Sequence, residues 1–343
     1  MLVQRIEELI QNNTTNFPLT VAYKNGSRFY SDFIDMIKAF EENLSEKEQD
    51  SIYNKIVIAY STDDVQVYHQ CNCELIVLYF ILRKYNSKFK YEPKYNGNYN
   101  PECSFEHNDV VVNIEVKTPD YSNRIEQENT DKIKIYLPER IPIKKTEKGE
   151  KCAIDQFNES SSNAEIIKRM DCKLKYFLEH SQKKFPYGEV YFNILVIALE
   201  TTHDADEWYT YILGDTGAFT DSSYVKSNYE NVDAILLCTP IAGINAWKKN
   251  PNTNVWYLEN TINVLILDPR KENNSKGKYY FDGAIDMFGD FTKEFVCYLQ
   301  ELDKNVPDVL TPEDYLIHKQ FDLSIITHYV EQLEKHSVIH SND

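Results

Sequence analysis

Hydrophobic residues gather most densely in the run CNCELIVLYFILRKY (71–85), which is apolar on nearly every side. Its length allows about four helical turns, and a helix that is apolar all round is typically buried. Residues 1–65 have a mainly helical pattern, interrupted by KIVIAY (55–60), which favours a short strand. The first part of the chain is therefore predicted to be helical and to lead into a buried helix.

Alternating or continuous apolar runs predict a series of strands after this helix. Three candidates follow closely, separated by turn-forming residues at 96–98 and 107–109: KFKYEP (88–93), ECSFEH (102–107) and VVVNIEVK (110–117). Later runs are continuously apolar and are typical of strands covered on both faces: VYFNILVIAL (190–199), VDAILLC (232–238) and NVLILD (263–268). A helix is expected between the first two of these, near 205–213.

The stretch between the two groups of strands is predicted to be a long polar loop followed by a helix. Residues 118–152 are mostly polar and charged. Ser162 and Glu165 then fit the S-x-x-E capping box that opens many helices. Behind it, an apolar stripe with helical spacing consists of Ile166, Met170, Leu174 and Phe177, while Lys168, Lys173 and Lys175 fall largely off that stripe.

This order of elements predicts an α/β protein with a mixed central sheet flanked by helices. Residues 1–65 form an N-terminal helical extension, 66–270 the core with an insert at 118–152, and 271–343 a mainly helical C-terminal region. The helices of that last region are expected at 290–302 and 322–336.

Composition indicates a globular protein without a membrane segment. Hydrophobic residues make up 42% of the 343 residues and charged residues 27%. Apolar runs are far shorter than the ~20 residues that span a bilayer, and the N-terminus lacks a signal-peptide pattern, so a soluble, cytoplasmic protein is expected. The seven cysteines include no CxxC pair; His69, Cys71 and Cys73 are interpreted as buried residues with reduced thiols rather than as zinc ligands.

The charge distribution leaves a nucleic-acid partner open. The formal net charge is −17, but residues 132–184 hold 13 Lys and Arg against 8 Asp and Glu. This basic segment is either a surface that faces phosphates or an ordinary solvated helix face with a charged loop.

The strand VVVNI runs directly into Glu115 and Lys117, and this is the main candidate for chemistry. On a strand, residues i and i+2 share a face. A turn near 107–109 would fold the preceding strand back and bring Glu102, at its start, beside Glu115. Two adjacent carboxylates repel unless a proton or cation joins them, and one or two carboxylates with waters and a substrate phosphate are the usual Mg²⁺ arrangement. Glu74, on the buried helix, is a third candidate.

These residues resemble the motif of the PD-(D/E)xK nuclease superfamily, which has the restriction-endonuclease-like fold. The match consists of Pro101–Glu102 and the Glu115–Val116–Lys117 tripeptide, preceded by a helix that carries Glu74. It covers about 130 residues, and Glu102 stands where the family usually has aspartate. Pro119–Asp120 is interpreted as a chance match because no E-x-K follows it at suitable spacing.

The resemblance implies phosphodiester hydrolysis with a divalent metal, Mg²⁺ or Mn²⁺. Glu102 and Glu115 would bind the metal, together with the backbone carbonyl of Val116. Lys117 would assist the attacking water, and Glu74 would correspond to the acidic residue on the helix in many members. The expected partner is DNA, bound by the basic segment 132–184.

Other interpretations remain open on the sequence alone. An E-x-K tripeptide is often a simple ion pair on a strand surface. The acidic chain with an altered first motif residue also fits a catalytically inactive nuclease-fold protein that serves as a binding or assembly module. A glycoside hydrolase with paired acids is a third, weaker option. A homodimer or a protein partner is also left open, and His203 and Asp204 are interpreted as part of a loop or helix cap.

Overall fold

A computed structural model describes residues 1–95, 100–107, 109–121, 171–214, 217–220, 228–249, 251–261, 263–268 and 271, together with the strand backbones of 133–137 and 164–168. The helices are α1 (Leu2–Gln11), α2 (Pro18–Lys24), α3 (Arg28–Asn43), α4 (Glu46–Ser61), α5 (Val65–Tyr85), α8 (Asp171–Lys184), α9 (Thr202–Leu213) and α10 (Pro240–Ala246), with short 3₁₀ turns at Asn86–Lys88 and Leu258–Asn260. The strands are β1 (Lys90–Tyr91), β2 (Cys103–His107), β3 (Val110–Lys117), β4 (Ile133–Leu137), β5 (Ala164–Lys168), β6 (Tyr191–Ala198), β7 (Ala234–Cys238) and β8 (Asn263–Leu267).

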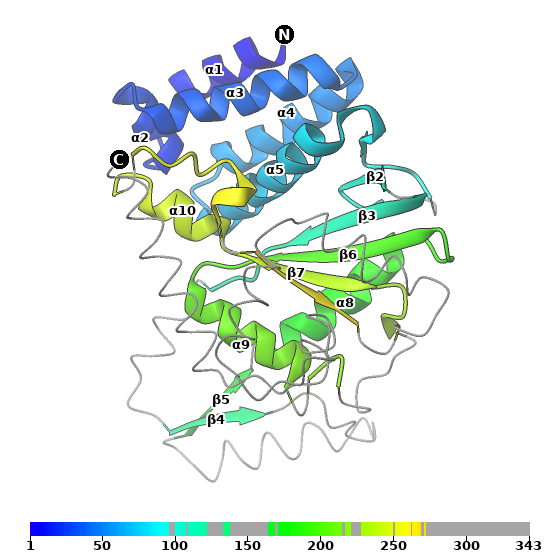
Figure 1. Cartoon of the computed structure of the whole chain (residues 1–343). Coiled ribbons are helices and arrows are strands. Elements are labelled where there is room, and N and C mark those ends of the chain that lie inside the picture. Colours follow the sequence, from blue (N-terminus) through cyan, green and yellow to red (C-terminus); the bar gives the residue numbers. More distant parts are fainter. Residues whose placement is uncertain are drawn as a thin grey trace, which may run out of the picture.

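The centre of the fold is a mixed six-stranded sheet with the order β1-β2-β3-β6-β7-β8 (Figure 1). Strands β3, β6 and β7 run parallel, whereas β1, β2 and β8 pair antiparallel at the two edges. Strands β4 and β5 form a separate two-stranded parallel sheet. The predicted α/β class with a mixed, helix-flanked sheet is confirmed.

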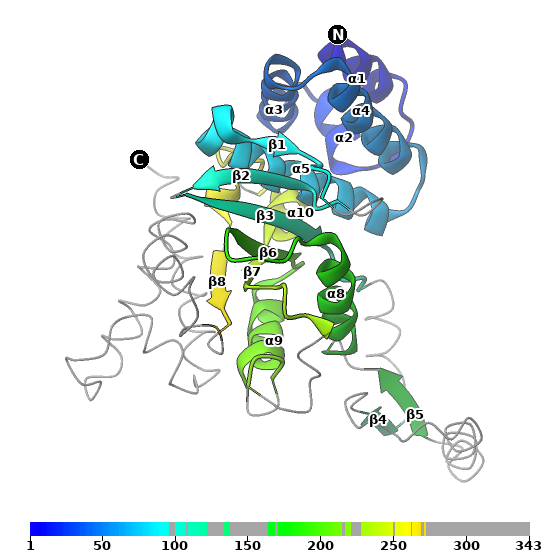
Figure 2. The ribbon, with the colours of Figure 1, turned by 90° about the vertical axis from the view of Figure 1, so that its right-hand side faces the viewer.

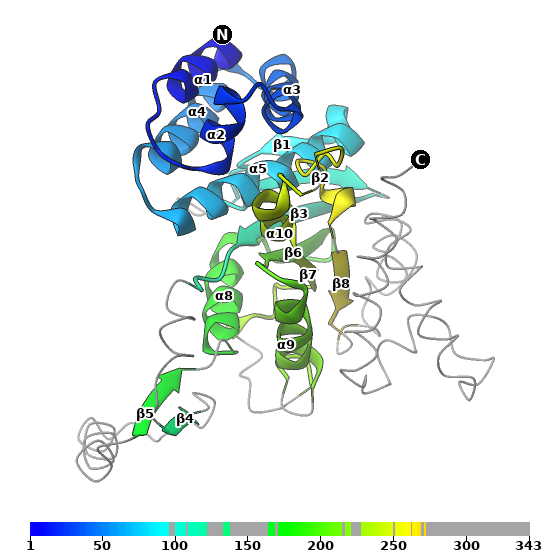
Figure 3. The same ribbon diagram turned by 90° about the vertical axis from the view of Figure 1, so that its left-hand side faces the viewer.

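Helices cover both faces of the sheet (Figures 2 and 3). On one face, Val112, Ile114 and Val116 of β3 belong to the hydrophobic core that also contains α5 and the N-terminal helices. On the other, Leu195 and Ile197 of β6 belong to the core with α8 and α9. Consecutive side chains of a strand point to opposite faces, which explains why the continuous apolar runs of the sequence form central strands.

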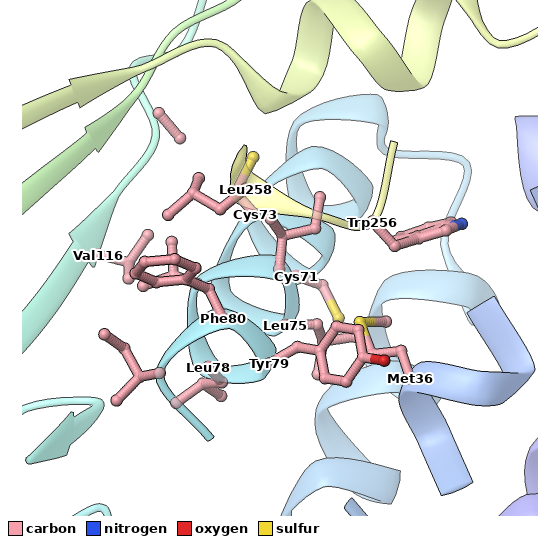
Figure 4. Packing of buried hydrophobic residues seen from close by; sticks show 14 of the residues in the cluster. Met36, Cys71, Cys73, Leu75, Leu78, Tyr79, Phe80, Val116, Trp256 and Leu258 are labelled. Atoms are coloured by element: carbon pink, nitrogen blue, oxygen red, sulfur yellow. The ribbon is translucent and has the colours of Figure 1, made fainter. Parts of the chain in front are cut away.

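Helix α5 is buried along most of its length, as its all-round apolar pattern predicts. Figure 4 shows its residues Cys73, Leu75 and Phe80 packed among side chains that include Val116 of β3 and Leu258. Asp64 caps the helix by accepting hydrogen bonds from the backbone N–H groups of Gln66 and Val67. This helix fixes Glu74 in the interior, next to the sheet.

The predicted strand at 55–60 is wrong, because these residues form the last turns of α4. The β-branched residues of KIVIAY favour a strand locally. Helix α4, however, buries Ile52, Ile56 and Ala59 with helical spacing and leaves Ile58 62% exposed. Tertiary packing of the helical face therefore outweighs the local preference.

The predicted helix beginning at Ser162 is also wrong. Residues Ala164–Lys168 form β5, and the helix begins only at Asp171. Two consecutive isoleucines, Ile166 and Ile167, suit a strand, and pairing with β4 replaces the local capping motif. Strand β4 likewise lies within the stretch 118–152, for which the polar pattern predicts a loop.

Several predicted features are not covered by the described residues. The helices expected at 290–302 and 322–336 lie outside the described part of the chain, as does most of the insert at 118–152. Among the helices that the structure does describe, none combines the length and apolar character needed to cross a bilayer.

Candidate active site

Strand β3 carries Glu115 and Lys117 on the face opposite the α5 core. Val116, between them, points into that core (Figure 4). The side chain of Glu115 is fully buried, and the Lys117 ammonium lies 2.6 Å from its Oε1. Alternation along the strand thus places a carboxylate and an ammonium together at the end of a buried strand, as the sequence predicts.

The hairpin of β2 and β3 brings Glu102 beside Glu115. Cys103 pairs with Ile114, and the backbone N–H of Glu102 donates a hydrogen bond of 2.9 Å to the carbonyl of Ile114. Glu102 directly precedes the paired residue Cys103, and Glu115 directly follows Ile114. Continuing the register by one residue therefore places Glu102 opposite Glu115. The predicted juxtaposition of these two carboxylates is confirmed by the strand pairing.

Helices α4 and α5 add Lys55 and Glu74 to the same place. The Lys55 ammonium lies 2.8 Å from Glu74 Oε2 and 2.8 Å from Glu102 Oε2. Gln70, one turn before Glu74 on α5, donates a hydrogen bond of 3.1 Å to Glu74 Oε1. Glu74 is therefore joined to the strand carboxylates through an ammonium group rather than by direct contact.

Helix α8 supplies a third ammonium from the other side of the sheet. The Lys184 Nζ lies 2.7 Å from Glu115 Oε1 and 3.5 Å from Glu102 Oε1. Charges of opposite sign therefore alternate through the whole group. We call this group the carboxylate–lysine cluster, and its members in order of contact are Glu74, Lys55, Glu102, Lys184, Glu115 and Lys117.

Burial and neighbouring charges shift the acids in different directions. Burial and the charge of Glu102 raise the pKa of Glu115 above its usual value, and the same two causes raise the pKa of Glu74. Burial alone would also raise the pKa of Glu102, but the ammonium groups of Lys55 and Lys184 outweigh it and lower that pKa. Glu102 is thus the acid that the lysines hold most firmly in its charged form.

The neighbouring carboxylates also shift the pKa values of the lysines. Burial works against the charged form of Lys55, but Glu74 and Glu102 together raise its pKa well above the usual value. The pKa of Lys184 is likewise raised, because the charges of Glu115 and Glu102 outweigh the effect of burial. His180, on α8, has a lowered pKa because of burial and the nearby charges of Lys117 and Lys184. The acids of the cluster therefore favour the charged forms of Lys55 and Lys184.

Sequence reasoning missed Lys55 and Lys184. Lys55 directly precedes Ile56 on the buried face of α4, so helical spacing would have directed it inward if 55–60 had been assigned to a helix. Lys184 continues the stripe of Leu174 and Phe177 at helical spacing. A lysine that extends an apolar stripe is therefore a usable signal for a buried cation.

The other residues noted in the sequence have simpler roles. Asp120 is exposed, and its carbonyl accepts a hydrogen bond of 3.0 Å from Lys173. Asp204 forms a capping box with Thr201 at the start of α9, which confirms its interpretation as part of a helix cap; the side chain of His203 lies outside the described residues. Cys71 and Cys73 are buried free thiols, as expected.

The donor set determines which metals this site suits. In the described part of the chain, no three His, Cys, Asp or Glu side chains are grouped to hold a metal ion. The two strand carboxylates nevertheless already share a cation, the Lys184 ammonium, within 3.5 Å of an oxygen of each. Two carboxylates completed by water and a substrate phosphate suit Mg²⁺, which keeps several of its waters. The residues present therefore fit a hydrated Mg²⁺ or Mn²⁺ better than a dehydrated ion such as structural Zn²⁺.

Comparison with known proteins adds no assignment to this geometry. No family model matches the chain, and neither the curated proteins nor the solved structures include a match.

Proposed function

We propose that the protein is a metal-dependent nuclease with a restriction-endonuclease-like core, and that it hydrolyses phosphodiester bonds in DNA. The observation that carries the proposal is the meeting of Glu102, Glu115 and Lys117 at one end of the sheet. Glu102 is aligned with Glu115 by the strand register, and the Lys117 ammonium lies 2.6 Å from Glu115.

The arrangement of the elements around this point supports the proposal. Helix α5 with Glu74 precedes the hairpin of β2 and β3, then α8 and the parallel strand β6 follow. This order resembles the helix, three strands, helix and strand of the PD-(D/E)xK core. The β4–β5 pair is an addition between the hairpin and α8.

In the proposed enzyme, Glu102 and Glu115 would hold one Mg²⁺ or Mn²⁺ together with the carbonyl of Val116. When bound, such an ion acts as a Lewis acid on the phosphoryl oxygen and lowers the pKa of its water. Lys117, directly beside Glu115, orients the attacking water and stabilises the negative charge that develops on the phosphate. Lys55 keeps Glu102 charged and in place, and Glu74 holds the Lys55 ammonium from the other side.

Lys184 has a different role in this proposal. Its ammonium bridges the two strand carboxylates at 2.7 and 3.5 Å. If Glu102 and Glu115 held a divalent ion, the Lys184 ammonium would no longer be needed between them and would be available to pair with a bound phosphate. Lys184 would thus balance the carboxylates in the metal-free protein and supply a cation to the substrate phosphate in the metal-bound one.

The charge balance of the cluster also favours a second candidate, a non-catalytic module. Each carboxylate of the cluster already contacts an ammonium within 2.8 Å, so the acids do not require a metal for charge balance. In that case the cluster would hold α4, α5, α8 and the hairpin together. The two candidates differ in their response to divalent ions.

Cleavage of plasmid DNA with and without divalent ions tests the proposed function. We expect cuts in Mg²⁺ or Mn²⁺ and none in EDTA, with activity restored when excess metal is added back. A non-catalytic module would leave the plasmid intact under every condition, and metal-independent cutting would rule out this mechanism.

A further inference from the structure

One edge of helix α8 leads outward from the carboxylate–lysine cluster. Helical spacing places Lys173, His180 and Lys184 along this edge, with Tyr176 and Lys183 beside them. We call these five residues the α8 edge. Lys184 lies in the cluster, and the ammonium of Lys173 reaches the carbonyl of Asp120, just beyond the end of β3. The α8 edge therefore runs alongside the chain that leaves the candidate active site.

The α8 edge is positively charged on an acidic protein. Three of its five residues are lysines, whereas the whole chain has a formal charge of −17. Glu179, an acidic residue of α8, lies four positions before Lys183 and accepts a hydrogen bond of 3.0 Å from Asn228. Within the described residues, no carboxylate lies within ion-pair distance of Lys183 or Lys173. Lysines that no described carboxylate neutralises suit a phosphate backbone.

Tyr176 gives the α8 edge an exposed aromatic face. Its side chain is 61% exposed, unlike most large hydrophobic side chains of the fold. Its ring lies 5.7 Å from that of His180, centroid to centroid, and His180 is close enough to Lys117 and Lys184 for their charges to act on it. Eight residues of helix separate Tyr176 from Lys184, or roughly 12 Å, which is about the length of two nucleotides of an extended strand.

We propose that the α8 edge binds an unpaired DNA strand, with one base stacked on Tyr176 and the flanking phosphates on the lysines. Aromatic stacking platforms within a basic groove are typical of sites for single strands, and a base within a duplex has no free face for such a contact. This inference rests on the proposed function, because it names the class of DNA that the proposed active site would cleave. The substrate is then single-stranded DNA or the unpaired part of a branched or frayed duplex.

Binding of a fluorescein-labelled single-stranded DNA, followed by anisotropy in EDTA, tests this inference on the full chain without cleavage. The cluster is charge-balanced without metal, so EDTA does not create a repulsive site. We expect Tyr176→Ala to weaken binding about tenfold and Tyr176→Phe to retain it. The matched control is Tyr187→Ala, because Tyr187 is also exposed, at 80%, but lies beyond the end of α8.

A strand with abasic sites separates stacking from a general effect of the substitution. If Tyr176 stacks on a base, the wild-type protein and Tyr176→Ala bind the abasic strand equally. A tenfold difference that persists on the abasic strand, or a loss that Tyr187→Ala shares, overturns the inference. The inference is also overturned if Tyr176→Ala weakens the binding of duplex and single-stranded DNA equally.

The outcomes also separate this inference from the proposed function. If Tyr176→Ala changes neither DNA binding nor metal-dependent cleavage, only the inference about the α8 edge is overturned. Absence of both binding and cleavage, for strand and duplex, overturns the nuclease proposal together with it. Unchanged melting temperatures of the three tyrosine variants serve as the folding control.

Discussion

Replacing Lys117 with methionine is expected to lower the rate of DNA cleavage by about 10²–10³-fold, the effect of removing one preorganised charge from a transition state. Methionine keeps much of the length and apolar stem of lysine but has no ammonium. The side chain is largely covered, with 16% exposure, and its Nζ lies 2.6 Å from Glu115. The measurement is the initial rate of plasmid cleavage in saturating Mg²⁺.

A matched substitution in the same sheet controls for general effects of losing a lysine. Lys90, on the edge strand β1, is 60% exposed and pairs with Glu106 at 3.6 Å. Lys90→Met should leave the cleavage rate within about twofold, because exposed ion pairs contribute little. Full activity of a folded Lys117→Met protein would contradict the proposed role of Lys117.

Replacing Lys55 with methionine is expected to destabilise the fold by roughly 3–5 kcal/mol at neutral pH, the usual effect of removing one partner from a buried ion pair. The substitution leaves Glu74 and Glu102 without the ammonium that lies 2.8 Å from each. Both carboxylates are nearly buried, with 7% and 11% exposure. Urea unfolding at fixed temperature measures the loss.

The pH dependence of this loss follows from the shifts of the two acids. Glu74 already has a raised pKa, and without Lys55 the pKa of Glu102 also loses a main cause of its lowering. A folded state with raised acid pKa values takes up protons more readily than the unfolded chain, so its relative stability increases as pH falls. The deficit of Lys55→Met should therefore be largest at neutral pH and shrink as the pH falls toward the usual range of glutamate.

Lys47 provides the control for Lys55, since it lies on the same helix and is exposed. Lys47→Met should change the free energy of unfolding by less than about 0.5 kcal/mol at every pH. A deficit of Lys55→Met that matches this control, or that stays constant between neutral and acidic pH, would contradict the account of the cluster.

The parts of the fold that follow from local pattern could be predicted from the sequence. The continuous apolar runs predict β3, β6 and β7, because a central strand that is buried on both faces has few polar residues. The two-residue period placed Glu115 and Lys117 on one face, and the turn before Val110 aligned Glu102 with Glu115. These steps need only neighbouring residues and one short hairpin.

The parts that depend on distant contacts could not be predicted in the same way. Lys55 reaches Glu102 across 47 positions of the chain, and Lys184 reaches Glu115 across 69. A position in line with an apolar helical stripe marks such a lysine as buried, but it does not show which distant carboxylate the lysine contacts. The strand propensity of KIVIAY also prevents the sequence from indicating that Lys55 faces inward, because helix packing rather than local preference decides the structure of α4.

The central claim is that Glu102 and Glu115 form a site for one divalent ion, and Mn²⁺ titration followed by thermal melting tests it most directly. We predict that the melting temperature of the wild-type protein rises with Mn²⁺, by an amount equivalent to about 2.7 kcal/mol at one hundred times the dissociation constant. The doubly substituted protein Glu102→Gln, Glu115→Gln should show no rise. A wild-type melting temperature that stays constant throughout the titration, or an equal rise in the doubly substituted protein, would contradict the claim.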